Sequence, residues 1–131
     1  MLLDTSGLLC LFHRAEECHA KAGEVFQAAR GKLTHNYLLA EFVALAEARR
    51  LSRQSSLLFL VGLLENLTIR VVWVDEALHG LAVSFLQARL DKSYSLRDAV
   101  SFLLMRQWSI TQALTTDHHF EQEGFERMLQ T

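Results

Sequence analysis

The stretch Leu2-Leu3-Asp4-Thr5-Ser6-Gly7-Leu8-Leu9 opens the chain. Its apolar pair predicts a buried strand, Thr-Ser-Gly predicts a turn, and the following leucines predict the start of a helix. Asp4 therefore stands at the carboxyl end of a strand, where open α/β sheets bind their ligands. An aspartate in this setting is also a common turn or helix N-cap residue. The rest of the chain has to decide between these two roles.

Composition predicts one globular domain that spans residues 1–131, because 50% of the residues are hydrophobic and 21% are charged. The net charge of −2 gives no overall attraction to nucleic acid, so any such contact has to come from a local patch. The longest apolar run, 57–64, is far shorter than the ~20 residues that span a bilayer. We expect a soluble, cytoplasmic protein without a membrane segment.

The two cysteines, Cys10 and Cys18, have no further cysteine or histidine pair at zinc-ligand spacing. Their spacing also matches no disulfide framework. We therefore expect two buried free thiols in a reducing compartment.

Strands and helices alternate along the chain. Besides the opening strand, strands are predicted at 32–35, 68–74 and 113–116, with an edge strand at 125–129. Helices are predicted at 8–14, 16–30, 36–50, 55–66, 77–89, 95–108 and 118–124, with Gly31 and Gly124 as closing glycines. This alternation predicts a three-layer α/β/α sandwich with a central parallel sheet of four to five strands.

Four acids occupy comparable places in this scheme. Asp4 and Asp117 follow strands, Glu41 lies in the first half of a helix, and Asp98 lies in the first turn of another. Strand ends and the helix starts that follow them share one edge of a parallel sheet, so all four can reach one cleft. Clustered carboxylates repel one another unless a hard divalent cation joins them. The expected ion is Mg²⁺ or Mn²⁺.

Some of these acids also have simpler interpretations. Glu41 lies within or beside the apolar face of its helix, so its carboxylate either reaches solvent or needs a cation. Ser95 and Asp98 form a capping-box pattern, which is compatible with a metal role for Asp98. The histidines are weaker candidates, because His118 and His119 are adjacent, would point to different faces, and lack a partner at metal-ligand spacing.

Four segments resemble PIN-domain proteins, especially VapC-type toxins, in their order along the chain. They are Leu-Leu-Asp-Thr-Ser-Gly-Leu-Leu at the start, Asn-Tyr-Leu-Leu-Ala-Glu-Phe at 36–42, Tyr-Ser-Leu-Arg-Asp-Ala-Val-Ser-Phe at 94–102 and Ala-Leu-Thr-Thr-Asp-His-His-Phe at 113–120. Asp4, Glu41, Asp98 and Asp117 fall on the family's four acidic positions. The resemblance implies a five-stranded parallel sheet, a dimer, and Mg²⁺-dependent cleavage of RNA by an activated water molecule.

The resemblance also implies roles for single residues. Asp4, Asp98 and Asp117 would hold the metal, and Glu41 would be a second-site ligand or help to deprotonate water. Thr5 follows the first acid, Ser95 lies three residues before the third, and Thr115 or Thr116 matches the hydroxyl before the fourth; of these, Thr5, Ser95 and Thr116 are our candidate supporting groups. The candidates for phosphate contacts are Arg14, Lys92 and Arg97, although each also fits a solvated surface.

Other functions are compatible with the same residues. The chain could be a catalytically silent PIN-fold module that binds RNA or protein, or a nuclease that acts on DNA. The apolar helix that contains residues 57–64 indicates a partner surface, either in a homodimer or for the helix of a cognate antitoxin.

Overall fold

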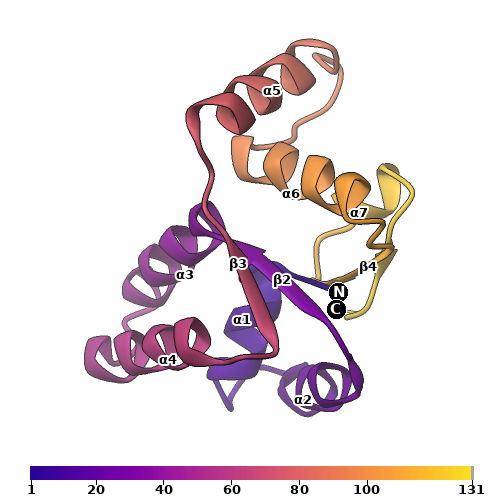
Figure 1. The fold of residues 1–131 in the computed structure, drawn as a ribbon. Coiled ribbons are helices and arrows are strands. Elements are labelled where there is room, and N and C mark those ends of the chain that lie inside the picture. Colours follow the sequence, from indigo (N-terminus) through magenta and orange to yellow (C-terminus); the bar gives the residue numbers. More distant parts are fainter. Residues whose placement is uncertain (131) are drawn as a thin grey trace.

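The computed structural model describes residues 1–130, whose five strands form one parallel sheet (Figure 1). The strands lie in the order β3-β2-β1-β4-β5, with β1 in the centre, paired with both β2 and β4. Their bounds are Leu2–Leu3 (β1), Lys32–His35 (β2), Ile69–Val72 (β3), Gln112–Leu114 (β4) and Glu126–Arg127 (β5). The expected parallel sheet of four to five strands is confirmed.

Seven helices cover the two faces of this sheet. They are α1 (Thr5–Phe12), α2 (His19–Ala28), α3 (Asn36–Ala48), α4 (Arg53–Glu65), α5 (Glu76–Gln87), α6 (Leu96–Gln107) and α7 (His119–Gln122). Helices α1 to α4 lie on one side and α5 to α7 on the other (Figure 1). The chain adds β2 and β3 on one side of β1 and then returns to add β4 and β5 on the other, so crossovers of one hand place α1 to α4 on one face and α5 to α7 on the opposite face. The predicted three-layer sandwich is confirmed.

The period of two in the central strand divides the core into two clusters. Leu2 faces the cluster under α5 and α6, whereas Leu3 faces the cluster under α1 to α4, and both are fully buried. In the neighbouring strand, Ala113 and Leu114 alternate in the same way. A strand that is buried on both faces explains why the opening leucines are consecutive apolar residues.

Two glycines need their lack of a side chain. A Cβ on Gly7 would overlap the backbone carbonyl of Leu114, so α1 can cross β4 this closely only with glycine there. Gly124 closes α7 at a φ of 88°, as predicted. Gly31 does not close α2, because that helix ends earlier, at Ala28, and its C-cap residue Ala29 is extended.

Cys10 and Cys18 form a disulfide, so the expectation of free thiols is wrong. The segment between α1 and α2 turns back along α1 and places the two Cα atoms 5.7 Å apart, within the usual disulfide range. The path of this irregular connection leaves no periodic signature in the sequence, which is why the pairing could not be predicted.

Helix α4 leaves much of its apolar surface exposed. Ser56 and Leu63 face the protein, whereas Leu58, Val61 and Leu64 are 64%, 47% and 46% exposed. Over residues 1–130, no helix is both long enough and apolar enough to cross a membrane.

Candidate active site

Three of the four acids meet at the carboxyl ends of the strands, at the point where the strand order reverses. Asp4 follows β1 directly, and Asp117 lies three residues beyond the end of the adjacent β4. Asp98 lies in the first turn of α6, which precedes β4. Sheets of this type bind their ligands at such a switch point.

Asp4 occupies the N-cap position of α1, yet its side chain makes no cap hydrogen bond. Its Oδ2 instead accepts hydrogen bonds from Thr115 Oγ1 at 2.7 Å and from Ser6 Oγ at 3.4 Å. The Oδ1 atom is buried without a hydrogen-bond partner, in a residue that is only 4% exposed. The capping interpretation of Asp4 is therefore wrong.

The surroundings of Asp4 resist its ionisation. Burial is the largest influence and raises the pKa of this carboxyl from 3.8 to about 6; the Thr115 hydrogen bond and Arg97 oppose the rise, whereas the nearby charge of Asp98 adds to it. A cation that bound the free Oδ1 would remove this penalty.

Asp98 forms the expected capping box and keeps one carboxylate oxygen free. The backbone N–H of Ser95 donates to Asp98 Oδ2 at 2.9 Å, and the backbone N–H of Asp98 donates to Ser95 Oγ at 3.1 Å, which completes a capping box. The Oδ1 atom of Asp98 is buried without a hydrogen-bond partner, and the residue is 3% exposed. The cap thus fixes one carboxylate oxygen and leaves the other free.

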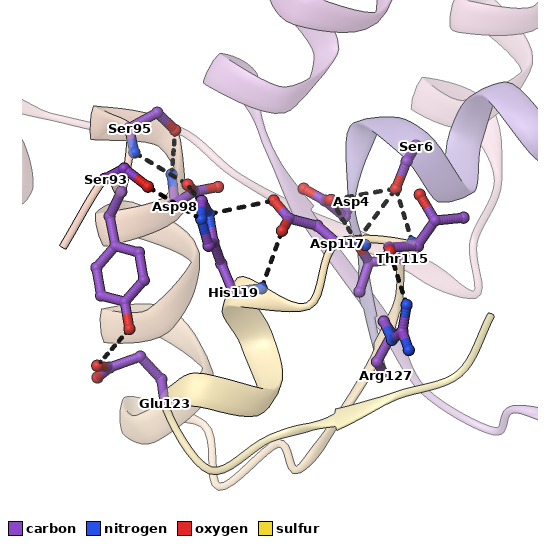
Figure 2. Close-up of polar contacts among 12 residues, drawn as sticks. Asp4, Ser6, Ser93, Ser95, Asp98, Thr115, Asp117, His119, Glu123 and Arg127 are labelled. Carbon is purple, nitrogen blue, oxygen red and sulfur yellow. Dashed lines mark hydrogen bonds and ion pairs between the residues drawn. The ribbon is translucent and has the colours of Figure 1, made fainter. Parts of the chain in front are cut away.

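His119 lies beside Asp98 and Asp117, an arrangement that the sequence did not predict. Its Nδ1 lies 3.5 Å from Asp98 Oδ2 and 3.5 Å from Asp117 Oδ2, and Figure 2 shows the ring between the two carboxylates. One ligand atom from each of the three residues can be chosen so that all lie within 4.8 Å of one another. His118 is exposed, so the two histidines do face different ways, as predicted, but one of them faces the acids.

Glu41 lies beside Arg97 rather than within the three-residue cluster. Its Oε2 is 4.0 Å from Arg97 Nη1, and the Glu41 side chain is 40% exposed. The Glu41 carboxylate therefore reaches solvent and also lies beside a cation, Arg97. Behind it, His35 is buried and lies 2.9 Å from Ser101 Oγ, and burial, with a further effect of Arg97, lowers its pKa to about 3, so this histidine is neutral.

The hydroxyl that supports Asp4 belongs to Thr115, not to Thr116. Thr116 contributes its backbone N–H, which donates to Ser6 Oγ at 3.0 Å. Thr115 Oγ1 also accepts the backbone N–H of Asp117 at 3.0 Å, so one hydroxyl links two of the acids. Thr5 Oγ1 points away to the Leu38 carbonyl, at 3.5 Å. Among the supporting residues predicted, Ser95 contacts an acid directly, Thr116 acts through Ser6, and the Thr5 hydroxyl contacts none.

The three predicted cationic residues have different positions. Arg97 lies beside Glu41, at the acids. Lys92 is exposed, pairs with Asp91 at 4.0 Å, and precedes Ser93, whose Oγ is 3.3 Å from His119 Nε2. Arg14 follows the far end of the eight-residue α1, about 12 Å along the axis from the Asp4 end, and the structure does not bring it to the acids.

The donor set suits a divalent cation. Two buried carboxylates each present an oxygen without a hydrogen-bond partner, and a third carboxylate, on Asp117, is partly exposed at the opening with 27% of its side chain accessible. Unpaired buried carboxylate oxygens are costly unless a cation binds them, and oxygen ligands are those that Mg²⁺ and Mn²⁺ accept.

Comparison with known proteins finds a likeness among solved structures. No protein-family model and no curated protein sequence matches the chain. Among solved structures, the chain is similar to VapC20 of Mycobacterium tuberculosis, a toxin that cleaves the sarcin-ricin loop, with a TM-score of 0.85, 26% identity and 95% of each chain covered. The agreement extends over nearly the whole of both chains and includes the sheet that carries the acids. This likeness confirms the resemblance of the chain to VapC-like PIN-domain proteins.

Proposed function

We propose that this protein is a divalent-metal-dependent endoribonuclease and the toxin of a toxin–antitoxin pair, with residues 1–131 as one nuclease domain. The observation that carries the proposal is the pair of unpartnered, buried carboxylate oxygens on Asp4 and Asp98 at the switch point of the sheet. The likeness to VapC20, a toxin that cleaves an RNA loop, supports RNA as the substrate class.

Asp4, Asp98 and Asp117 are the residues that would hold Mg²⁺ or Mn²⁺. When bound, such an ion acidifies water and stabilises the negative charge that develops on the phosphate. The protein holds the ligands in place beforehand: Thr115 orients Asp4, Ser95 orients Asp98, and the His119 backbone N–H orients Asp117 at 2.9 Å. Because these oxygens need little rearrangement, binding a cation loses little conformational freedom.

Glu41 and Arg97 lie beside the carboxylates and suit the remaining tasks. Glu41 is partly exposed, so its carboxylate can accept the proton of an attacking water molecule. The 4.0 Å separation leaves the Arg97 guanidinium with donors that Glu41 does not occupy, and 33% of the Arg97 side chain is exposed. A guanidinium with free donors is suited to an RNA phosphate.

Replacing Arg97 with glutamine is expected to weaken RNA binding more than it slows cleavage. The loss of one charged phosphate contact should raise KM about tenfold, which corresponds to about 1.4 kcal/mol. Steady-state cleavage of a short RNA measures both constants, and Arg14→Gln is the matched control because Arg14 lies far from the acids. Equal KM values for the two variants would show that Arg97 does not bind the substrate.

The proposal is tested with RNA and DNA hairpins of the same sequence, one pair carrying the sarcin-ricin loop. We expect Mg²⁺ or Mn²⁺ to support cleavage of RNA, EDTA to stop it, and added metal to restore it. Cleavage of the DNA hairpin at an equal rate would favour a DNA nuclease, since the 2′-OH distinguishes the two substrates. RNA binding without cleavage, and without heat of Mn²⁺ binding in calorimetry, would favour the silent binding module.

We also propose that the exposed face of α4 packs against a partner, either a second copy or the helix of an antitoxin. The exposed apolar side chains Leu58, Val61 and Leu64 support this. They are spaced three residues apart, so they form an apolar stripe along α4 of the kind that packs against another helix. Light scattering that finds only monomers of the purified protein, together with the absence of a copurifying antitoxin, would contradict it.

A further inference from the structure

We infer that His119 is a nitrogen ligand of the metal centre, and that the centre therefore prefers a first-row transition ion to Mg²⁺. This inference rests on the proposed function, because it assumes that the carboxylates bind a divalent cation. Beyond that function, the inference names a metal-binding residue that is not one of the four acids, and the kind of ion that the site prefers.

The first argument is the position of the imidazole nitrogen. His119 Nδ1 is 3.5 Å from an oxygen of Asp98 and 3.5 Å from an oxygen of Asp117, but it is buried without a hydrogen-bond partner. These contacts are within ion-pair distance and lack the alignment of a hydrogen bond. Two neighbouring ligands of an octahedral ion, each about 2.1 Å from it, lie about 3.0 Å apart. A small inward movement of these side chains would therefore let all three bind one ion.

The second argument is the contact of the other ring nitrogen. Nε2 lies 3.3 Å from Ser93 Oγ, which can accept its proton. With a cation between the ring and the carboxylates, a proton on Nε2 would leave the Nδ1 lone pair free for the ion, which is the arrangement of a metal-binding histidine. The ring of Tyr94 packs edge-on against His119 at 5.2 Å and holds this orientation.

The third argument is the free oxygen of Asp98, whose other oxygen lies 3.5 Å from His119 Nδ1. Asp98 is 3% exposed, and its Oδ1 has no hydrogen-bond partner although its Oδ2 is fixed by the Ser95 backbone. The site thus offers a buried carboxylate oxygen and an imidazole nitrogen together. Mg²⁺ prefers oxygen ligands in octahedral geometry and keeps several of its water molecules, whereas first-row transition ions accept imidazole readily.

The test uses Mn²⁺ as the metal and His119→Phe as the variant, since phenylalanine keeps a ring against Tyr94 and removes both nitrogens. We expect pulsed electron paramagnetic resonance of the Mn²⁺-loaded protein to show coupling to a directly bound ¹⁴N nucleus, and the variant to lack it. Competition titrations should show the preference for Mn²⁺ over Mg²⁺ falling about tenfold in the variant. His118→Phe is the matched control, because His118 is exposed, and it should keep both properties.

The possible failures separate the two proposals. If Mn²⁺ binds to the unaltered protein without ¹⁴N coupling, His119 is not a ligand, and the metal-dependent nuclease stands. If the coupling persists in His119→Phe, the inference is also wrong. If the unaltered protein binds no Mn²⁺, both this inference and the metal dependence of the proposed function fail.

Discussion

Replacing Asp98 with asparagine is expected to reduce metal-dependent RNA cleavage at least about 1,000-fold, because the loss of about 4 kcal/mol of transition-state stabilisation has that effect on rate. The fold should remain, since an asparagine Oδ1 can still accept the Ser95 N–H that now donates to Asp98 at 2.9 Å. The measurement is the single-turnover rate on a labelled RNA hairpin at saturating Mg²⁺, with circular dichroism to confirm the fold.

Asp75→Asn is the matched control for this change. Asp75 is exposed, caps α5 by accepting the Leu78 N–H at 2.8 Å, and plays no part in the acidic site. The two variants make the same chemical change at a helix start, and only one of them removes a proposed metal ligand. If Asp98→Asn retained cleavage within tenfold of Asp75→Asn, the proposed role of Asp98 would be wrong.

The fold could be predicted because its signals are local. Strand β2 occupies the predicted residues 32–35, and the Ser95 and Asp98 capping box forms as its spacing indicated. The predictions failed at the irregular connections between elements. Gly31 does not close α2, and Cys18 meets Cys10 only because the connection after α1 folds back along that helix.

For the candidate site, the convergence of three acids could be predicted from the sequence, but their hydrogen bonds could not. Parallel topology brings Asp4, Asp98 and Asp117 to one edge, so the order of elements along the chain was sufficient for these three. The hydrogen bond from Thr115 to Asp4 joins residues 111 positions apart, and no local pattern distinguishes Thr115 from Thr116 as its donor. His119 could have been considered from its place just after Asp117, but the sequence does not give the direction of a side chain in a four-residue helix.

The pH dependence of stability should reveal the cost of burying Asp4. Its pKa is raised from 3.8 to about 6 in the folded protein, mainly by burial. Between these pH values the folded state holds a proton that the unfolded state has released, so this group makes the protein less stable as the pH rises. The full difference, about 3 kcal/mol, is reached above pH 6 in the absence of metal.

Asp4→Asn removes this dependence and isolates it from the other acids. With EDTA present, urea unfolding at a series of pH values should show the free energy of unfolding of the unaltered protein falling by about 2 kcal/mol relative to Asp4→Asn between pH 4 and pH 7. Added Mg²⁺ or Mn²⁺ should recover stability at pH 7 in the unaltered protein and much less in Asp4→Asn, because a cation at Oδ1 compensates the buried charge. Asp75→Asn, which changes an exposed carboxylate, should follow the unaltered protein in both experiments. Parallel pH profiles for Asp4→Asn and the unaltered protein would mean that the Asp4 carboxylate is not penalised by burial, and would remove the main physical reason for assigning it to the metal.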